Sequence, residues 1–169
     1  FRGLAPNAEV VLIRTADQRQ QISDHSILNA LRWLQAHHQE YEIRVVNLSI
    51  SGEAVPNLEI NPIDEAIDRL VAEGVVVTAA SGNDGVRNLV PPASAPAAIT
   101  VGGIDDKNNF DPADIKLWHS NFGAGDGGVL KPEVVAPSLW IVACILPGSE
   151  LAEEAERLFE DPESNRARI

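Results

Sequence analysis

The stretch NPIDEAIDRLVAEGVVVTAASGNDG, residues 61–85, predicts a helix, a buried strand and a tight turn in immediate succession. Asn61 is a good N-cap residue, and Pro62 suits the first helical position, where its missing N–H costs nothing. Apolar residues recur at helical spacing up to Gly74, which fits the end of the helix. The β-branched run at residues 75–80 follows at once and predicts a buried strand.

The same alternation of strands and helices extends along the chain. It predicts an α/β fold with a mostly parallel sheet in three layers, with helices on both faces. In open sheets of this kind, sites form beyond the carboxyl ends of the strands. The loops that follow the strands are residues 15–21, 51–61 and 81–85. The expected strands are 9–14, 44–50, 75–80 and 98–102, with a fifth candidate at 141–145; the expected helices are 23–38, 61–74 and the acidic segment 149–160.

The composition fits one domain and excludes several kinds of partner. The chain has 169 residues, 44% of them hydrophobic, and a formal net charge of −12 at pH 7. This charge argues against nucleic acid and anionic membranes as partners, and no apolar run approaches the roughly 18 residues of a membrane-spanning helix. The single cysteine, Cys144, excludes an internal disulfide and a cysteine-built zinc site. Because the sequence contains no methionine and begins with Phe1, we expect a processed chain or a fragment.

Asn83 is the residue of the turn that could carry chemistry. The glycines on either side of it, Gly82 and Gly85, permit a backbone turn that most residues cannot adopt. One interpretation is that the segment SGNDG is only a tight turn. The other is that the Asn83 carboxamide, which donates hydrogen bonds without carrying charge, stabilises the oxyanion of a tetrahedral intermediate.

Six blocks of the sequence, in the expected order, resemble segments of the subtilisin-like serine proteases (the subtilase family, peptidase S8). The chain is therefore identified as a member of this family, as a central fragment of its catalytic domain. Residues 1–148 are expected to belong to the peptidase domain, and residues 149–169 to form an acidic helix and loose tail inserted before the serine motif. The blocks are GLAPN at 3–7, VVNLSISG at 45–52, EGVVVTAASGNDG at 73–85, PASAPAAITVG at 92–102, HSNFG at 119–123 and KPEVVAP at 131–137.

The resemblance implies site roles for residues near the ends of two expected strands. Asn83 matches the side-chain donor of the family's oxyanion hole, which makes it the catalytic residue that this chain carries. The segment that pairs with the substrate backbone matches Ser49, Ile50 and Ser51. The wall of the pocket for the residue preceding the scissile bond matches Ala80, Ser81 and Gly82, whose small size suits the entry of a large side chain.

The family's catalytic Asp, His and Ser motifs do not occur in these 169 residues. By resemblance, the Asp and His motifs would precede residue 1, and the serine motif would follow residue 137. The parent would be a serine endopeptidase that works through an acyl-enzyme, and we expect the chain alone to be inactive. His119 beside Ser120 suggests a catalytic dyad, but neighbours on a strand point to opposite faces, which argues against one.

Two other functions compete with this interpretation. The alternative within the same fold is a non-catalytic pseudoprotease or peptide-binding module. A nucleotide-binding domain is disfavoured because the glycine-rich phosphate-binding motifs are missing. We expect a peptide or protein substrate as partner, with no nucleic acid and no membrane.

No cofactor and no metal site are expected in this chain. The acidic residues between Asp105 and Asp126 do not match the spacing of a calcium loop, although the resemblance makes calcium possible in the full-length protein. The resemblance also favours a secreted protein.

Overall fold

The computed structural model describes residues 5–53, 61–109, 111–139, 141 and 145–160. It divides into two units. The larger, Val10–Trp140, contains the sheet and two helices. The smaller, Phe1–Glu9 with Ile141–Ile169, contains helix α3, Glu150–Glu160, which confirms the helix expected over this acidic segment. No helix in the described part of the chain is both long and apolar enough to cross a membrane.

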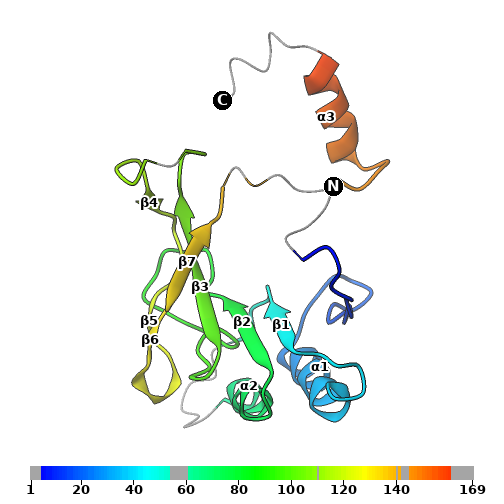
Figure 1. Cartoon of the computed structure of the whole chain (residues 1–169), viewed down its shortest axis with the longest axis vertical. Coiled ribbons are helices and arrows are strands. Elements are labelled where there is room, and N and C mark those ends of the chain that lie inside the picture. The colour runs from blue at the N-terminus through cyan, green and yellow to red at the C-terminus, as the bar shows by residue number, and fades with distance from the viewer. Residues whose placement is uncertain (1–4, 54–60, 110, 140, 142–144, 161–169) are drawn as a thin grey trace. The chain divides into compact units, whose positions relative to one another are not determined.

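The sheet of the larger unit runs in the order β1–β2–β3–β4, with β7 also paired to β3 (Figure 1). β1–β2, β2–β3 and β3–β7 are parallel pairs, whereas β4 is antiparallel to β3. The parallel pairing expected for residues 44–50, 75–80 and 98–102 is therefore confirmed. The strands are β1 Val45–Leu48, β2 Val76–Ala80, β3 Ile99–Asp105, β4 Lys116–Leu117 and β7 Val134–Pro137, while β5 Gly123–Ala124 and β6 Leu130–Lys131 form a separate pair around the 3₁₀ turn Asp126–Gly128 (η1).

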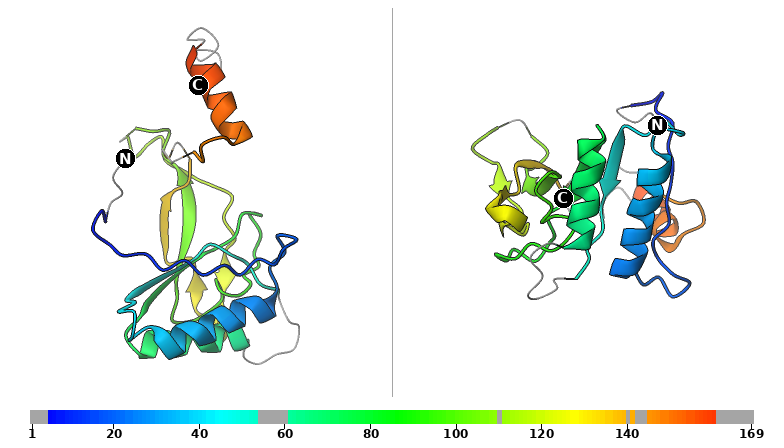
Figure 2. Two further views of the ribbon diagram at one scale, coloured as in Figure 1. Left: turned by 90° about the vertical axis from the view of Figure 1, so that its right-hand side faces the viewer. Right: turned by 90° about the horizontal axis from the view of Figure 1, so that it is seen from below.

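Helices α1, Asp24–His37, and α2, Pro62–Ala72, begin where their capping residues predict. The Ser23 side chain accepts a hydrogen bond from the Ser26 amide at 3.2 Å, and Asn61 Oδ1 accepts one from the Ile63 amide at 2.9 Å. The two helices lie side by side on the sheet (Figure 2). A hydrogen bond of 3.0 Å from Gln35 Nε2 to the Ala66 carbonyl joins them.

Strand residues alternate between a covered and an open face. Val46 and Val77 point toward the helices and are buried in one core with residues of α1 and α2. On the opposite face, Val45 and Val76 remain 63% and 45% exposed. The mostly parallel α/β fold is thus confirmed, and in the larger unit both described helices cover the same face.

The strand expected at residues 9–14 is not formed, which corrects that prediction. Val10 and Leu12 are 73% and 90% exposed, and no strand among the described residues pairs with this run. β-Branched residues favour an extended backbone, but a strand also needs a hydrogen-bonded neighbour and a covered face.

The last strand of the sheet also differs from expectation. β7 comes from the KPEVVAP block, whose short run between prolines gave no strand signal. The candidate strand at 141–145 includes residues 142–144, which lie outside the described residues.

One carboxyl group of α2 is buried. Asp64 is 1% exposed, and Ser94 Oγ donates a hydrogen bond of 2.5 Å to its Oδ2, while Oδ1 has no partner among the described residues. Burial raises the pKa of Asp64 to about 7; the Ser94 bond opposes this rise, and the neighbouring Asp126 carboxyl adds to it. The Asp64 carboxyl therefore holds its proton at mildly acidic pH.

Candidate active site

A cavity of about 270 Å³ lies at the carboxyl ends of the parallel strands. Four of the residues to which the sequence assigned site roles line it together, namely Ser49, Ala80, Ser81 and Asn83. The described structure therefore brings the proposed oxyanion donor and part of the proposed substrate-binding set to one place.

The parallel register explains why these residues meet. Leu48 of β1 is paired with Ala79 of β2, so Ser49 and Ala80 leave the sheet side by side. Ala80 is in turn paired with Val101 of β3, which also lines the cavity. The carboxyl ends of neighbouring parallel strands lie at one edge of a sheet, as sites in open α/β folds require.

Asn83 lies in the loop that follows β2 and is exposed. The loop is anchored where it leaves the sheet, because the Ser81 amide donates a hydrogen bond of 3.0 Å to the Val101 carbonyl. Gly82 follows with a φ of +100°, a conformation that side chains with a Cβ rarely adopt. The Asn83 carboxamide makes no hydrogen bond within the described structure, so both of its N–H groups are available to a bound oxygen atom.

The other assigned residues lie near the cavity without lining it. Ile50 is half-buried and packs against the core, while Ser51 is exposed. The segment after them is fixed by two hydrogen bonds: the Gly52 amide donates to the Pro91 carbonyl at 2.7 Å, and the Glu53 amide donates to Asp24 Oδ1 at 2.9 Å. Pairing of Ser49, Ile50 and Ser51 with a substrate backbone stays a prediction, as does a role for Gly82.

Sequence reasoning missed several residues of the cavity wall. Trp118, Ser120 and Ser138 line it, and they come from segments far along the chain from Asn83. Ser120 is held against β3, because the Gly103 amide donates a hydrogen bond of 2.6 Å to its Oγ. The only sequence signal that could have placed these residues near Asn83 is that they lie in or next to blocks that resemble the family. No charged side chain is among the described residues that line the cavity, so its walls suit an uncharged group.

His119 and Ser120 do not form a dyad in the described structure. The Ser120 hydroxyl accepts the Gly103 amide, whereas the His119 ring lies against Trp118, with ring centroids 4.0 Å apart. The interpretation that these neighbours are not a base and its nucleophile therefore agrees with their geometry.

Acidic side chains do not gather at the cavity. Within the described residues, no group of three or more His, Cys, Asp or Glu side chains is placed to hold a metal ion. Asp111 and Asp106 instead accept hydrogen bonds from backbone amides in their own loop. Calcium binding by a longer protein stays a prediction.

Comparison with known proteins gives consistent matches. Residues 1–156 match the model of the subtilase family. The chain is 33% identical over 152 residues to subtilisin BL of Lederbergia lenta, covering 89% of this chain and 48% of that protein. It is 31% identical over 150 residues to an alkaline protease of Alkalihalobacillus alcalophilus, covering 89% of this chain and 34% of that protein.

A solved structure supports the fold. The chain resembles sphericase with a TM-score of 0.64 and 20% identity, over 80% of this chain and 45% of that one. The chain therefore spans between about a third and a half of the length of these relatives.

Proposed function

The chain belongs to the subtilase family, and on this premise we propose that it is the central part of a serine endopeptidase domain that hydrolyses peptide bonds through an acyl-enzyme. The observation that carries the proposal is the position of Asn83. Its exposed carboxamide, which has no hydrogen bond in the described structure, stands beside an uncharged cavity at the carboxyl ends of the strands.

The chemistry follows from this position. When a nucleophile attacks a peptide carbonyl, negative charge develops on the carbonyl oxygen. A fixed N–H donor lowers the barrier most if it binds that oxygen in the tetrahedral state. Asn83 is the proposed donor, and the residue preceding the scissile bond would enter the cavity lined by Ser49, Ala80 and Ser81.

The proposed nucleophile and its base are not among residues 1–169. The chain contains no motif for the family's catalytic Asp, His or Ser, and it spans only part of its relatives. One oxyanion donor cannot replace a nucleophile, so residues 1–169 alone are proposed to be inactive.

The substrate class, location and cofactor use belong to the same proposal. The substrate is a peptide or protein with an uncharged side chain before the scissile bond, which the neutral cavity walls favour. Membership of the family favours a protein that acts outside the cell, and we propose that it needs no organic cofactor. Calcium binding by the full-length protein stays a prediction.

The test compares the full-length protein with residues 1–169. Both are incubated with a fluorophosphonate serine probe and with casein. We expect one labelled serine and casein cleavage for the full-length protein, and neither for residues 1–169. Labelling of Ser120 or Ser149 in the short chain would show that the site is misassigned. A full-length protein that binds peptides without labelling would be the non-catalytic alternative.

A further inference from the structure

Asn121 lies buried beneath the loop that carries Asn83. Its side chain is 5% exposed, and its Oδ1 accepts hydrogen bonds from the Asp84 amide at 2.9 Å and the Val86 amide at 3.3 Å. Its Nδ2 donates to Asp84 Oδ2 at 3.2 Å, and its own amide donates to the Gly82 carbonyl at 3.1 Å. Asn121 thus binds the loop on both sides of Asn83, through its backbone N–H at Gly82 and through its carboxamide at Asp84 and Val86.

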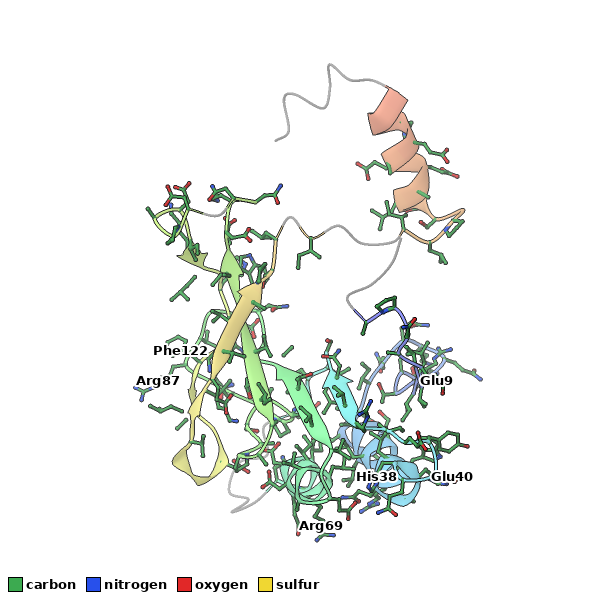
Figure 3. All side chains as sticks on the ribbon, viewed as in Figure 1. Glu9, His38, Glu40, Arg69, Arg87 and Phe122 are labelled. Atoms are coloured by element: carbon green, nitrogen blue, oxygen red, sulfur yellow. The ribbon has the colours of Figure 1, made fainter. Side chains whose placement is uncertain are left out.

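The contact between this side chain and the loop is close as well as polar. A Cβ placed on Gly82 would lie 2.5 Å from Asn121 Nδ2, so the loop rests directly on Asn121. The next residue continues the contact, because the Phe122 amide donates to the Val86 carbonyl at 3.1 Å. Figure 3 labels Phe122 and Arg87, which mark the place where the two segments meet.

The segment that contains Asn121 is itself joined to the sheet. On its N-terminal side, the Trp118 amide donates to the Gly103 carbonyl at 3.0 Å, and Ser120 accepts the Gly103 amide. Asn121 therefore connects the loop to β3 through a chain of hydrogen bonds. The Asn83 side chain makes no hydrogen bond of its own in the described structure, so its place depends on this backbone.

We propose that Asn121 is a positioning residue that holds the Asn83 carboxamide at the oxyanion, an inference that rests on the proposed function above. An oxyanion donor must be fixed before charge develops, and a misplacement of about 1 Å can cost on the order of 10²-fold in rate. Asn121 acts through Asn83 and touches no reacting atom.

We call the hydrogen bonds of the Asn121 side chain to Asp84 and Val86 the clamp. The clamp requires a hydrogen-bond acceptor and a donor in one side chain. Asn121→Asp keeps the size and the acceptor for the two amides, but it places a carboxylate against the Asp84 carboxylate. Adding Asp84→Asn restores a donor and an acceptor with their positions exchanged. Asn109→Asp is the matched control, because Asn109 Nδ2 donates to Asp114 Oδ2 at 2.9 Å in an exposed loop.

The kinetic test uses the full-length protein and a chromogenic peptide. We expect Asn121→Asp to lower kcat by on the order of 10- to 10²-fold with KM within about twofold of wild type. Asp84→Asn together with Asn121→Asp should recover most of the loss, and Asn109→Asp should change neither constant. In the Asn83→Leu background, Asn121→Asp should cause no further loss, because the residue through which it acts is gone.

Two results would overturn the proposal. One is an unchanged kcat in Asn121→Asp. The other is an equal additional loss in the Asn83→Leu background, which would show that Asn121 acts independently of Asn83.

A readout without catalysis separates this inference from the proposed function. Amide hydrogen exchange at Asp84 and Val86, followed by NMR in the same proteins, should accelerate in Asn121→Asp and recover in the exchanged pair. If the wild-type protein cleaves no peptide, the proposed function fails. Accelerated exchange then still supports the clamp on the Asn83 loop, and unchanged exchange overturns it.

Discussion

Replacing Asp64 by Asn should make the stability of the protein less dependent on pH. Folding raises the pKa of this carboxyl from 3.8 to about 7, chiefly through burial. Between these two values the folded state holds a proton that the unfolded state has lost. The wild-type free energy of unfolding therefore falls as the pH rises from about 4 through about 7, and it levels off above that.

The size of the effect follows from the same pKa values. A difference of about three pH units, at about 1.4 kcal/mol per unit, corresponds to on the order of 4 kcal/mol. Asn has the shape of the protonated acid: its oxygen can accept the Ser94 hydroxyl, and its Nδ2 can face Asp126. Asp64→Asn should thus match wild type near pH 4 and be more stable by up to this amount at pH 8.

The measurement is urea unfolding of wild type and variant at several pH values between 4 and 8. Glu65→Gln is the control, because Glu65 is an exposed residue of the same helix turn whose ion pair with Arg69 contributes about 1 kcal/mol or less. If wild type and Asp64→Asn differ in free energy of unfolding by the same amount at pH 4 and at pH 8, the assignment of Asp64 as a buried, protonated carboxyl is wrong.

Two further substitutions test the site and its support. In the full-length protein, Asn83→Leu should lower kcat with little change in KM, on the order of the 10²- to 10³-fold loss known for removing this donor from a subtilisin; an almost unchanged kcat in peptide assays would leave Asn83 as only a turn residue. Lys131, 3% exposed, donates from Nζ to the Ala98 carbonyl at 2.6 Å and the Pro96 carbonyl at 3.3 Å. Lys131→Met should destabilise the protein by about 1–3 kcal/mol for the buried Ala98 carbonyl that it leaves unpaired, seen as a lower Tm, whereas the exposed Lys107→Met should have a much smaller effect.

Local signals in the sequence were sufficient to predict the elements whose ends are marked by their own residues. Ser23 and Asn61 cap the two helices as predicted, and all of β2, Val76–Ala80, lies within the run predicted at 75–80. The run at 9–14 has the same β-branched character, yet it forms no strand, because pairing depends on a neighbour and not on the run itself. β7 illustrates the reverse case, in which a run without a local strand signal becomes a strand by pairing with β3.

The site could be predicted only in part for a related reason. Ser49, Ala80, Ser81 and Asn83 follow directly from strand ends, so a parallel sheet brings them together. The support of Asn83 by Asn121 joins residues distant in sequence, and neither has a pattern that points to the other. Asp64 was expected only as part of a helix, since its raised pKa depends on burial in the folded protein and on Ser94 and Asp126, which come from other segments.

The open face of the sheet has a consequence for how this chain behaves in solution. Val45, Val76 and Ile99 leave a strip of apolar surface, and among the described strands β1 lies at the edge, where an unpaired strand can bind a second one. Such surfaces attract each other, while a net charge of −12 keeps molecules apart near neutral pH. As acid neutralises the carboxylates this repulsion weakens, so association through this face should be strongest near the isoelectric pH of about 4.6, where the Asp64 carboxyl is also protonated.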